Sequence, residues 1–127
     1  MQPCVLIVED DPGAAELLEL LFSQDGYTVE IVRDGLSAVE RLDGPAVDLV
    51  VLDVMMPNRD GIAVLRELRC RPGWAETPVI ISTARGSDEA VWDGWRAGAD
   101  YYLVKPFEPD ELRSVATSLV EGGHVPT

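Results

Sequence analysis

The stretch CVLIVEDDP, residues 4–12, is an apolar run that ends in three acidic residues and a proline. A continuously apolar run of this length is typical of a strand buried on both faces of a parallel sheet. Asp11 followed by Pro12 is typical of a helix start, because aspartate can cap free backbone N–H groups and proline fits the first helical position. The stretch therefore predicts a buried strand that passes directly into a helix, with Glu9 and Asp10 in the turn between them.

The same alternation of strand and helix continues through the chain. The predicted strands are Cys4–Val8, Thr28–Val32, Asp48–Leu52, Pro78–Ser82 and Tyr101–Val104. The predicted helices are Pro12–Gln24, Leu36–Leu42, Gly61–Arg71, Asp88–Ala97 and Pro109–Glu121. Because consecutive parallel strands need a long crossover, strict alternation predicts a parallel sheet with helices on both faces.

The apolar content of the strands predicts their order. Asp48–Leu52 and Pro78–Ser82 are nearly as apolar as the first strand, so both belong in the middle of the sheet. Thr28–Val32 alternates apolar and polar residues, as an edge strand with one wetter face does, and Tyr101–Val104 is less aliphatic. The order 2-1-3-4-5 fits these differences, and the predicted fold class is a flavodoxin-like (βα)5 fold.

Length and composition limit the classes of function. The chain has 127 residues, which is enough for one domain with one core. Lys and Arg total 10 and Asp and Glu total 23, and the net charge of −13 argues against direct binding to nucleic acid or to an anionic membrane. There is no membrane-length apolar run and no basic start of a signal peptide, and Cys4 and Cys70 form no disulfide framework, so we expect a cytoplasmic protein. We expect residues 1–121 to form the domain and residues 122–127 to be a tail or the start of a linker.

Polar side chains stand where four of the predicted strands end. Glu9 and Asp10 follow the first strand, Asp53 the third, Thr83 the fourth and Lys105 the fifth. Ligand sites in open α/β sheets form beyond the carboxyl ends of the strands, so we expect these side chains to share one crevice.

The three carboxylates of this crevice need a cation. Two like charges 4 Å apart repel by about 4 kcal/mol at an effective dielectric constant of 20. Hard carboxylate oxygens open to solvent suit Mg²⁺ or Mn²⁺ rather than zinc, and neither His124 nor the cysteines fall near this edge. Beside such a metal, Thr83 and Lys105 would complete a pocket for a phosphoryl group, with Asp53 as the nucleophile.

Four segments in order resemble those of bacterial two-component response regulator receiver domains. The segments are VLIVEDD at 5–11, DVMMPNRDG at 53–61, IISTA at 80–84 and GADYYLVKPF at 98–107. The resemblance covers about residues 3–121. It implies a signalling domain with the fold of a chemotaxis regulator, which accepts a phosphoryl group from the phosphohistidine of a sensor histidine kinase or a phosphotransfer protein. The resemblance also implies that the chain is not an enzyme with a separate substrate, because such a domain catalyses only its own phosphorylation and dephosphorylation.

The resemblance also implies roles for the acidic residues. Asp53 matches the phosphoacceptor aspartate. Asp10, Asp53 and the backbone carbonyl of Met55 match direct ligands of Mg²⁺, and Glu9 matches an acid that acts through water.

Other matching residues belong to the switch and to the turns. Thr83 matches a hydroxyl that moves to the phosphoryl oxygens, and Lys105 the cation that pairs with them. Tyr102 matches an aromatic residue that rotates when the threonine moves. Lys105–Pro106 matches a cis peptide bond, and Gly61 matches the turn glycine that opens a helix.

Helix Asp88–Ala97 carries the predicted partner surface. Its helical periodicity places Ala90, Val91, Gly94, Trp95 and Gly98 on one buried face. Trp92 then lies on the opposite side of the helix and faces solvent. The resemblance assigns this helix to signalling. We expect Trp92 to contact a partner or a second copy of the chain, more strongly after phosphorylation.

Three other functions fit parts of the pattern. The same fold could serve as a pseudo-receiver that binds partners without phosphorylation. A metal-dependent phosphohydrolase of the haloacid-dehalogenase class would use Asp53 as nucleophile, but it needs a second acid where Met55 stands. A flavodoxin-type flavin carrier needs a phosphate-binding loop after the first strand, where the acidic residues 9–11 would repel phosphate.

Overall fold

In a computed structural model that describes residues 2–56 and 60–122, five strands alternate with five helices. The strands are β1 (Cys4–Val8), β2 (Thr28–Val32), β3 (Leu49–Leu52), β4 (Val79–Thr83) and β5 (Tyr101–Val104). The helices are α1 (Pro12–Gln24), α2 (Gly35–Arg41), α3 (Gly61–Cys70), α4 (Asp88–Ala97) and α5 (Pro109–Val120). The predicted residues 57–59 of the second motif and the tail after Gly122, with His124, lie outside the described residues.

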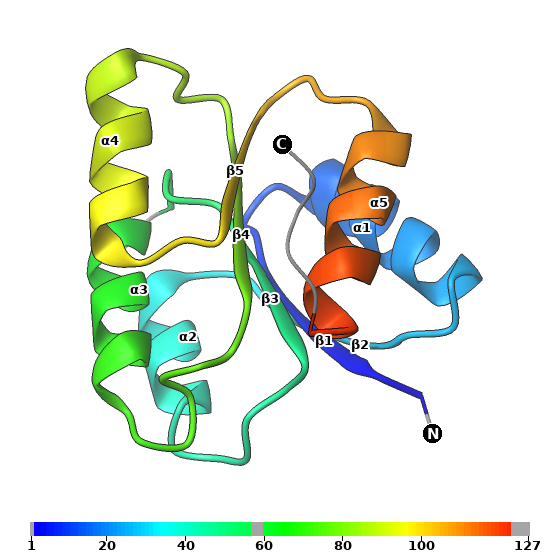
Figure 1. Cartoon of the computed structure of the whole chain (residues 1–127), viewed down its shortest axis with the longest axis horizontal. Coiled ribbons are helices and arrows are strands. Elements are labelled where there is room, and N and C mark those ends of the chain that lie inside the picture. Colours follow the sequence, from blue (N-terminus) through cyan, green and yellow to red (C-terminus); the bar gives the residue numbers. More distant parts are fainter. Residues whose placement is uncertain (1, 57–59, 123–127) are drawn as a thin grey trace.

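All five strands form one parallel sheet in the order β2-β1-β3-β4-β5, which confirms the predicted fold class. Figure 1 shows α1 and α5 on one side of the sheet and α2, α3 and α4 on the other. Because side chains alternate along a strand, each central strand supplies both cores. In β1, Val5 and Ile7 pack under α1 and α5, and Leu6 and Val8 pack under the other three helices.

The edges of the sheet are the wetter strands, as predicted. Residues of β2 are exposed or half-buried along its whole length, whereas every residue of β3 and β4 is buried. This difference places the best-shielded backbone directly beneath the strand ends that carry the polar residues.

Seven boundaries in five elements differ from the prediction by one residue: the start of β3, both ends of β4 and of α2, and the ends of α3 and α5. β3 begins at Leu49 because the carboxylate of Asp48 accepts a hydrogen bond from the backbone N–H of Cys4, 2.7 Å away. β4 extends to Thr83 because this residue still pairs with β5, and its carbonyl accepts from the N–H of Lys105 at 2.7 Å. α2 begins at Gly35 because Asp34 caps it.

The predicted buried face of α4 is wrong by part of a turn. Trp95 is 42% exposed, and the residues that face the sheet are Ala90, Gly94 and Ala97. Small side chains let the helix lie close to the sheet, and an indole would hold it away. Trp92 is 61% exposed, as predicted.

Over the described ranges, none of the helices combines the length and the apolar character needed to cross a bilayer. Both cysteines are free thiols.

Candidate functional site

Three carboxylates meet at the carboxyl edge of the sheet. Glu9 and Asp10 follow β1 and Asp53 follows β3, the neighbouring strand. One carboxylate oxygen of each lies within 4.8 Å of the others. Glu9 is 1% and Asp53 7% exposed, whereas Asp10 is open to solvent. The cluster therefore has a buried floor and one ligand at its rim, which leaves it accessible to an ion.

Lys105 reaches into this cluster from the end of β5. Its ammonium donates hydrogen bonds to Glu9 Oε1 at 2.5 Å and to Asp53 Oδ2 at 3.2 Å. Burial lowers the pKa of Lys105, but the hydrogen bond to Glu9 and the charge of Asp53 raise it by more, so the pKa lies above its ordinary value. Lys105 is therefore a fixed cation, and the peptide bond to Pro106 that follows it is cis.

One ammonium leaves the three carboxylates with excess negative charge. Burial raises the pKa of Glu9 and the charge of Asp53 raises it further, although the hydrogen bond from Lys105 acts in the opposite direction. The remaining repulsion and the hard oxygen donors fit a divalent cation of the Mg²⁺ type, since such ions bind through one or two carboxylates and keep several waters. Among the described residues, this is the cluster of acids that meets the geometry of a metal site.

The backbone holds the Asp53 side chain in place. The N–H of Met55 donates to Asp53 Oδ1 at 2.8 Å, and the Asp53 N–H donates to the carbonyl of Val8 at 2.9 Å. A Cβ on Gly61 would lie 2.4 Å from the Cα of Val54 and 2.7 Å from the Asp53 carbonyl oxygen. Only glycine therefore allows α3 to begin against the loop that carries Asp53.

Thr83 and Tyr102 are linked through the backbone of Arg85. The N–H of Arg85 donates to Thr83 Oγ1 at 3.4 Å, and the carbonyl of Arg85 accepts from the Tyr102 hydroxyl at 2.6 Å. Thr83 is fully buried and Tyr102 is half-buried. Burial raises the pKa of Tyr102, so its hydroxyl keeps its proton and remains a donor. Sequence reasoning had paired the two side chains but had not found this connection.

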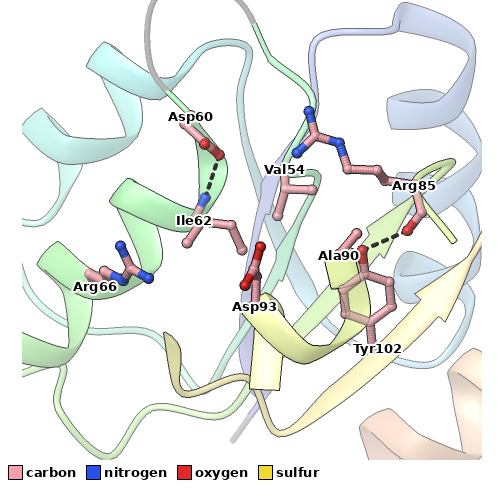
Figure 2. A pocket seen from close by; sticks show the side chains of 8 residues that line it. All are labelled: Val54, Asp60, Ile62, Arg66, Arg85, Ala90, Asp93 and Tyr102. Atoms are coloured by element: carbon pink, nitrogen blue, oxygen red, sulfur yellow. Dashed lines mark hydrogen bonds between the residues drawn. The ribbon is translucent and has the colours of Figure 1, made fainter. Parts of the chain in front are cut away.

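A pocket of about 200 Å³ opens between α3 and α4 beside this connection (Figure 2). Its lining residues are Val54, Asp60, Ile62, Arg66, Arg85, Ala90, Asp93 and Tyr102. Two arginines and two aspartates balance its charge.

The predicted site residues thus fall into three groups, one of which is the pair Thr83 and Tyr102 linked through the Arg85 backbone. The structure brings together Glu9, Asp10, Asp53 and Lys105, and it keeps the Met55 backbone beside them. Trp92 lies elsewhere, on the outer face of α4, where a groove of about 440 Å³ is lined by Asp88, Val91, Trp92 and Trp95.

A doubly wound parallel sheet with an acidic cluster, a lysine and a buried threonine at its carboxyl edge defines an α/β signalling domain. The sequence pattern described as "Response regulator receiver domain" matches residues 5–117. The chain belongs to this family and is a receiver domain of two-component signalling.

Two curated relatives are longer than this chain. The transcriptional regulatory protein TcrA of Mycobacterium tuberculosis is 43% identical over 122 residues, which are 96% of this chain and 47% of TcrA. The response regulator MprA of Mycobacterium ulcerans is 44% identical over 108 residues, 85% of this chain and 46% of MprA. The chain therefore spans about half the length of these relatives.

Solved structures share the fold over nearly the whole chain. The receiver domain of the sensor histidine kinase PA1611 from Pseudomonas aeruginosa, which has a magnesium ion coordinated in its active-site cleft, superposes with a TM-score of 0.88 at 29% identity. The match covers 95% of this chain and 99% of that one. The chemotaxis response regulator CheY4 of Vibrio cholerae superposes with a TM-score of 0.86 at 28% identity, over 94% and 99% of the two chains.

Proposed function

We propose that the chain accepts a phosphoryl group on Asp53 from the phosphohistidine of a sensor histidine kinase or a phosphotransfer protein. The observation that carries this proposal is the Asp53 carboxylate, which is held by Lys105 and by the Met55 N–H within reach of two further carboxylates. A nucleophile fixed by two donors at an open sheet edge is oriented before its substrate arrives, which lowers the entropic cost of reaction.

Mg²⁺ would be held by Asp10, Asp53 and the backbone carbonyl of Met55, with Glu9 acting through water, and Mn²⁺ has the same ligand preference. When bound, the ion would neutralise charge on the phosphoryl oxygens. Lys105 would pair with one of these oxygens, as its raised pKa keeps it charged.

In the transfer step, a carboxylate oxygen of Asp53 forms a bond to phosphorus while the bond from phosphorus to the imidazole nitrogen breaks. The imidazole keeps the electron pair of that bond. The chain turns over no separate substrate in this step, so its catalysis serves only its own phosphorylation and later dephosphorylation.

The new group would act on the switch residues through charge. A phosphoryl group adds about −1.5 to −2 charges next to Thr83. The present hydrogen bond to Thr83 Oγ1 is long, 3.4 Å, so the hydroxyl gives up little when it moves to the phosphoryl oxygens. Movement of Thr83 displaces the Arg85 backbone, whose carbonyl accepts the hydrogen bond from the Tyr102 hydroxyl. The Tyr102 side chain then either moves with this carbonyl or loses the hydrogen bond. The surface of α4, β5 and α5 changes as a result.

Acetyl phosphate and Mg²⁺ test the phosphoacceptor. The intact mass should rise by one phosphate in the wild type and should stay unchanged in Asp53→Asn. Labelling that persists in chelator, or that maps to another residue, would show the mechanism to be wrong. The absence of any label from both small donors and kinases would favour the alternative, a phosphorylation-independent pseudo-receiver.

We also propose Trp92 as a partner contact, with a second copy of the chain as the occupant of its groove. Asp88 and Arg96 lie one helical turn before and after Trp92, and neither forms an ion pair with another described residue. The guanidinium of Arg96 stacks 5.6 Å from the Trp92 ring. Two α4 helices packed antiparallel about Trp92 would set each Asp88 opposite the partner's arginine.

Sedimentation tests this contact. Phosphorylated wild type should associate more than unphosphorylated protein, and Trp92→Ala should weaken association while Asp53 still labels. Asp88→Arg and Arg96→Asp should each weaken it, and the double exchange should restore it. If wild type and variants remain monomeric with and without phosphate, the homodimer proposal is wrong.

A further inference from the structure

Gly94 occupies a position that disfavours glycine. It lies in the interior of α4, where glycine is among the least favourable residues because it loses the most backbone freedom on folding. It is buried and has a helical backbone, so no left-handed conformation requires a glycine here. Another physical reason must account for the missing side chain.

The aromatic ring of Tyr102 supplies that reason. A Cβ at position 94 would lie 2.7 Å from both Cδ2 and Cε2 of Tyr102, and 2.9 Å from Cδ1 of Ile81. Carbon atoms in contact are about 3.5–4.0 Å apart, so a methyl group and this ring position exclude each other. Ile81 can yield by moving the end of a flexible side chain, whereas the ring of Tyr102 is rigid.

The hydroxyl of Tyr102 prevents the ring from moving aside without cost. It donates to the carbonyl of Arg85 at 2.6 Å, as Figure 2 shows. The N–H of Arg85 is in turn bonded to Thr83 Oγ1. A continuous set of contacts therefore runs from Thr83 through the Arg85 backbone and the Tyr102 ring to the face of α4 that Gly94 leaves bare.

We propose that Gly94 is the positioning residue that admits the Tyr102 ring against α4 and thereby couples the threonine–tyrosine switch to this helix. A side chain at position 94 expels the ring, breaks the hydrogen bond to Arg85 and uncouples α4 from Thr83. The packing part of this inference stands on the geometry alone, and only the response to phosphorylation rests on the proposed function.

A double-mutant cycle in melting temperature isolates the contact. Alanine is a better helix former than glycine, so Gly94→Ala should raise the melting temperature by roughly 2–4 °C wherever the new methyl group meets no obstacle. In the Tyr102→Ala background this gain should appear. In the wild-type background it should be absent or reversed. The contact with Ile81 is present in both backgrounds and cancels in the difference.

Gly13→Ala is the matched control. Gly13 is exposed near the start of α1, and a Cβ there would meet only Asp11 Oδ2 at an ordinary 3.6 Å. This substitution should change the melting temperature equally with and without the Tyr102 ring. If Gly94→Ala also gives the same change in both backgrounds, the proposal is overturned. The cycle uses unphosphorylated protein, so its outcome does not depend on whether Asp53 accepts a phosphoryl group.

A second measurement separates coupling from mere packing. In wild type, nuclear Overhauser contacts should connect the Tyr102 ring to the Gly94 Hα protons, and Gly94→Ala should shift the ring signals toward those of an exposed tyrosine. Asp53 of the variant should still label with acetyl phosphate, while the change in tryptophan fluorescence of α4 on labelling should be lost. A full fluorescence response in the variant would overturn the coupling.

Discussion

Glu9 is the acid at the site whose ionisation the fold opposes. It is 1% exposed, and burial together with the charge of Asp53 raises its pKa above the 4.5 of an unperturbed glutamate, although Lys105 counteracts both. An acid with a raised pKa binds its proton more tightly in the folded chain than in the unfolded chain. Its contribution to stability is therefore complete below the unfolded pKa and is lost as the pH rises through the folded pKa.

Glu9→Gln removes this proton linkage. In urea unfolding with chelator present, the free energy of unfolding of wild type minus that of the variant should fall as the pH rises above about 4.5, by about 1.4 kcal/mol for each unit of pKa difference. Glu19→Gln removes an exposed charge on α1 without touching the cluster, and it serves as the control. A difference that rises with pH would mean that Glu9 is stabilised as the carboxylate.

At the scale of elements, Arg69 of α3 joins the helix to the two loops at the opposite edge of the sheet. Its guanidinium donates five hydrogen bonds, to the carbonyls of Gly98, Ala75 and Thr77 and to Asp100. Gly98 ends α4 with a φ of 108°. Arg69 therefore fixes the carboxyl end of α4 to α3. The contact between α4 and Tyr102 is made at Gly94, one helical turn before this end.

Arg69→Met keeps the apolar stem and leaves these carbonyl groups without their donor, so it should lower the free energy of unfolding by about 2 kcal/mol or more. Arg66→Met on the same helix is the control, because the Arg66 side chain is exposed and forms no ion pair with another described residue. It should change stability by no more than about 0.5 kcal/mol. Equal losses in the two variants, measured by urea unfolding, would contradict this role of Arg69.

The elements that sequence predicts well are those with local signals. Asp11 caps α1 as its sequence predicts, and both bounds of β1 agree with the prediction. α2 starts one residue before the predicted Leu36 because the Asp34 side chain caps it. The end of β4 was displaced because it depends on pairing with Val104, a contact that no local pattern contains.

The acidic cluster was predictable because topology alone brings strand ends together. The rotation of α4 about its own axis was not predictable from the sequence, because it depends on which side chain fits against the sheet. Periodicity placed both Gly94 and Trp95 inward, but only Gly94 is buried, against the ring of Tyr102, and Trp95 is exposed. The connection between Thr83 and Tyr102 could not be predicted from the sequence either, since both of its hydrogen bonds use the backbone of Arg85.

The whole molecule carries a net charge of −13, so it repels itself in the folded state. The three carboxylates at the sheet edge concentrate this repulsion at one place. A divalent cation that binds only the folded form should therefore raise the melting temperature, and at a free concentration of 100 Kd the gain is about 2.7 kcal/mol in the free energy of unfolding. Screening by any salt would also stabilise the fold, so the specific effect must be separated from it.

Calorimetric melts with Mg²⁺, and with NaCl at the same ionic strength, make this separation. Mg²⁺ should raise the melting temperature of wild type by several degrees more than NaCl does. Asp10→Ala should bring the two salts to the same value, because the rim ligand is lost while the overall charge changes by only one. The metal-free variant should also melt no lower than metal-free wild type, since one source of repulsion is gone and the Asp10 side chain is exposed at the rim. If millimolar Mg²⁺ acts on wild type no differently from NaCl, the acids at this edge do not form a divalent site.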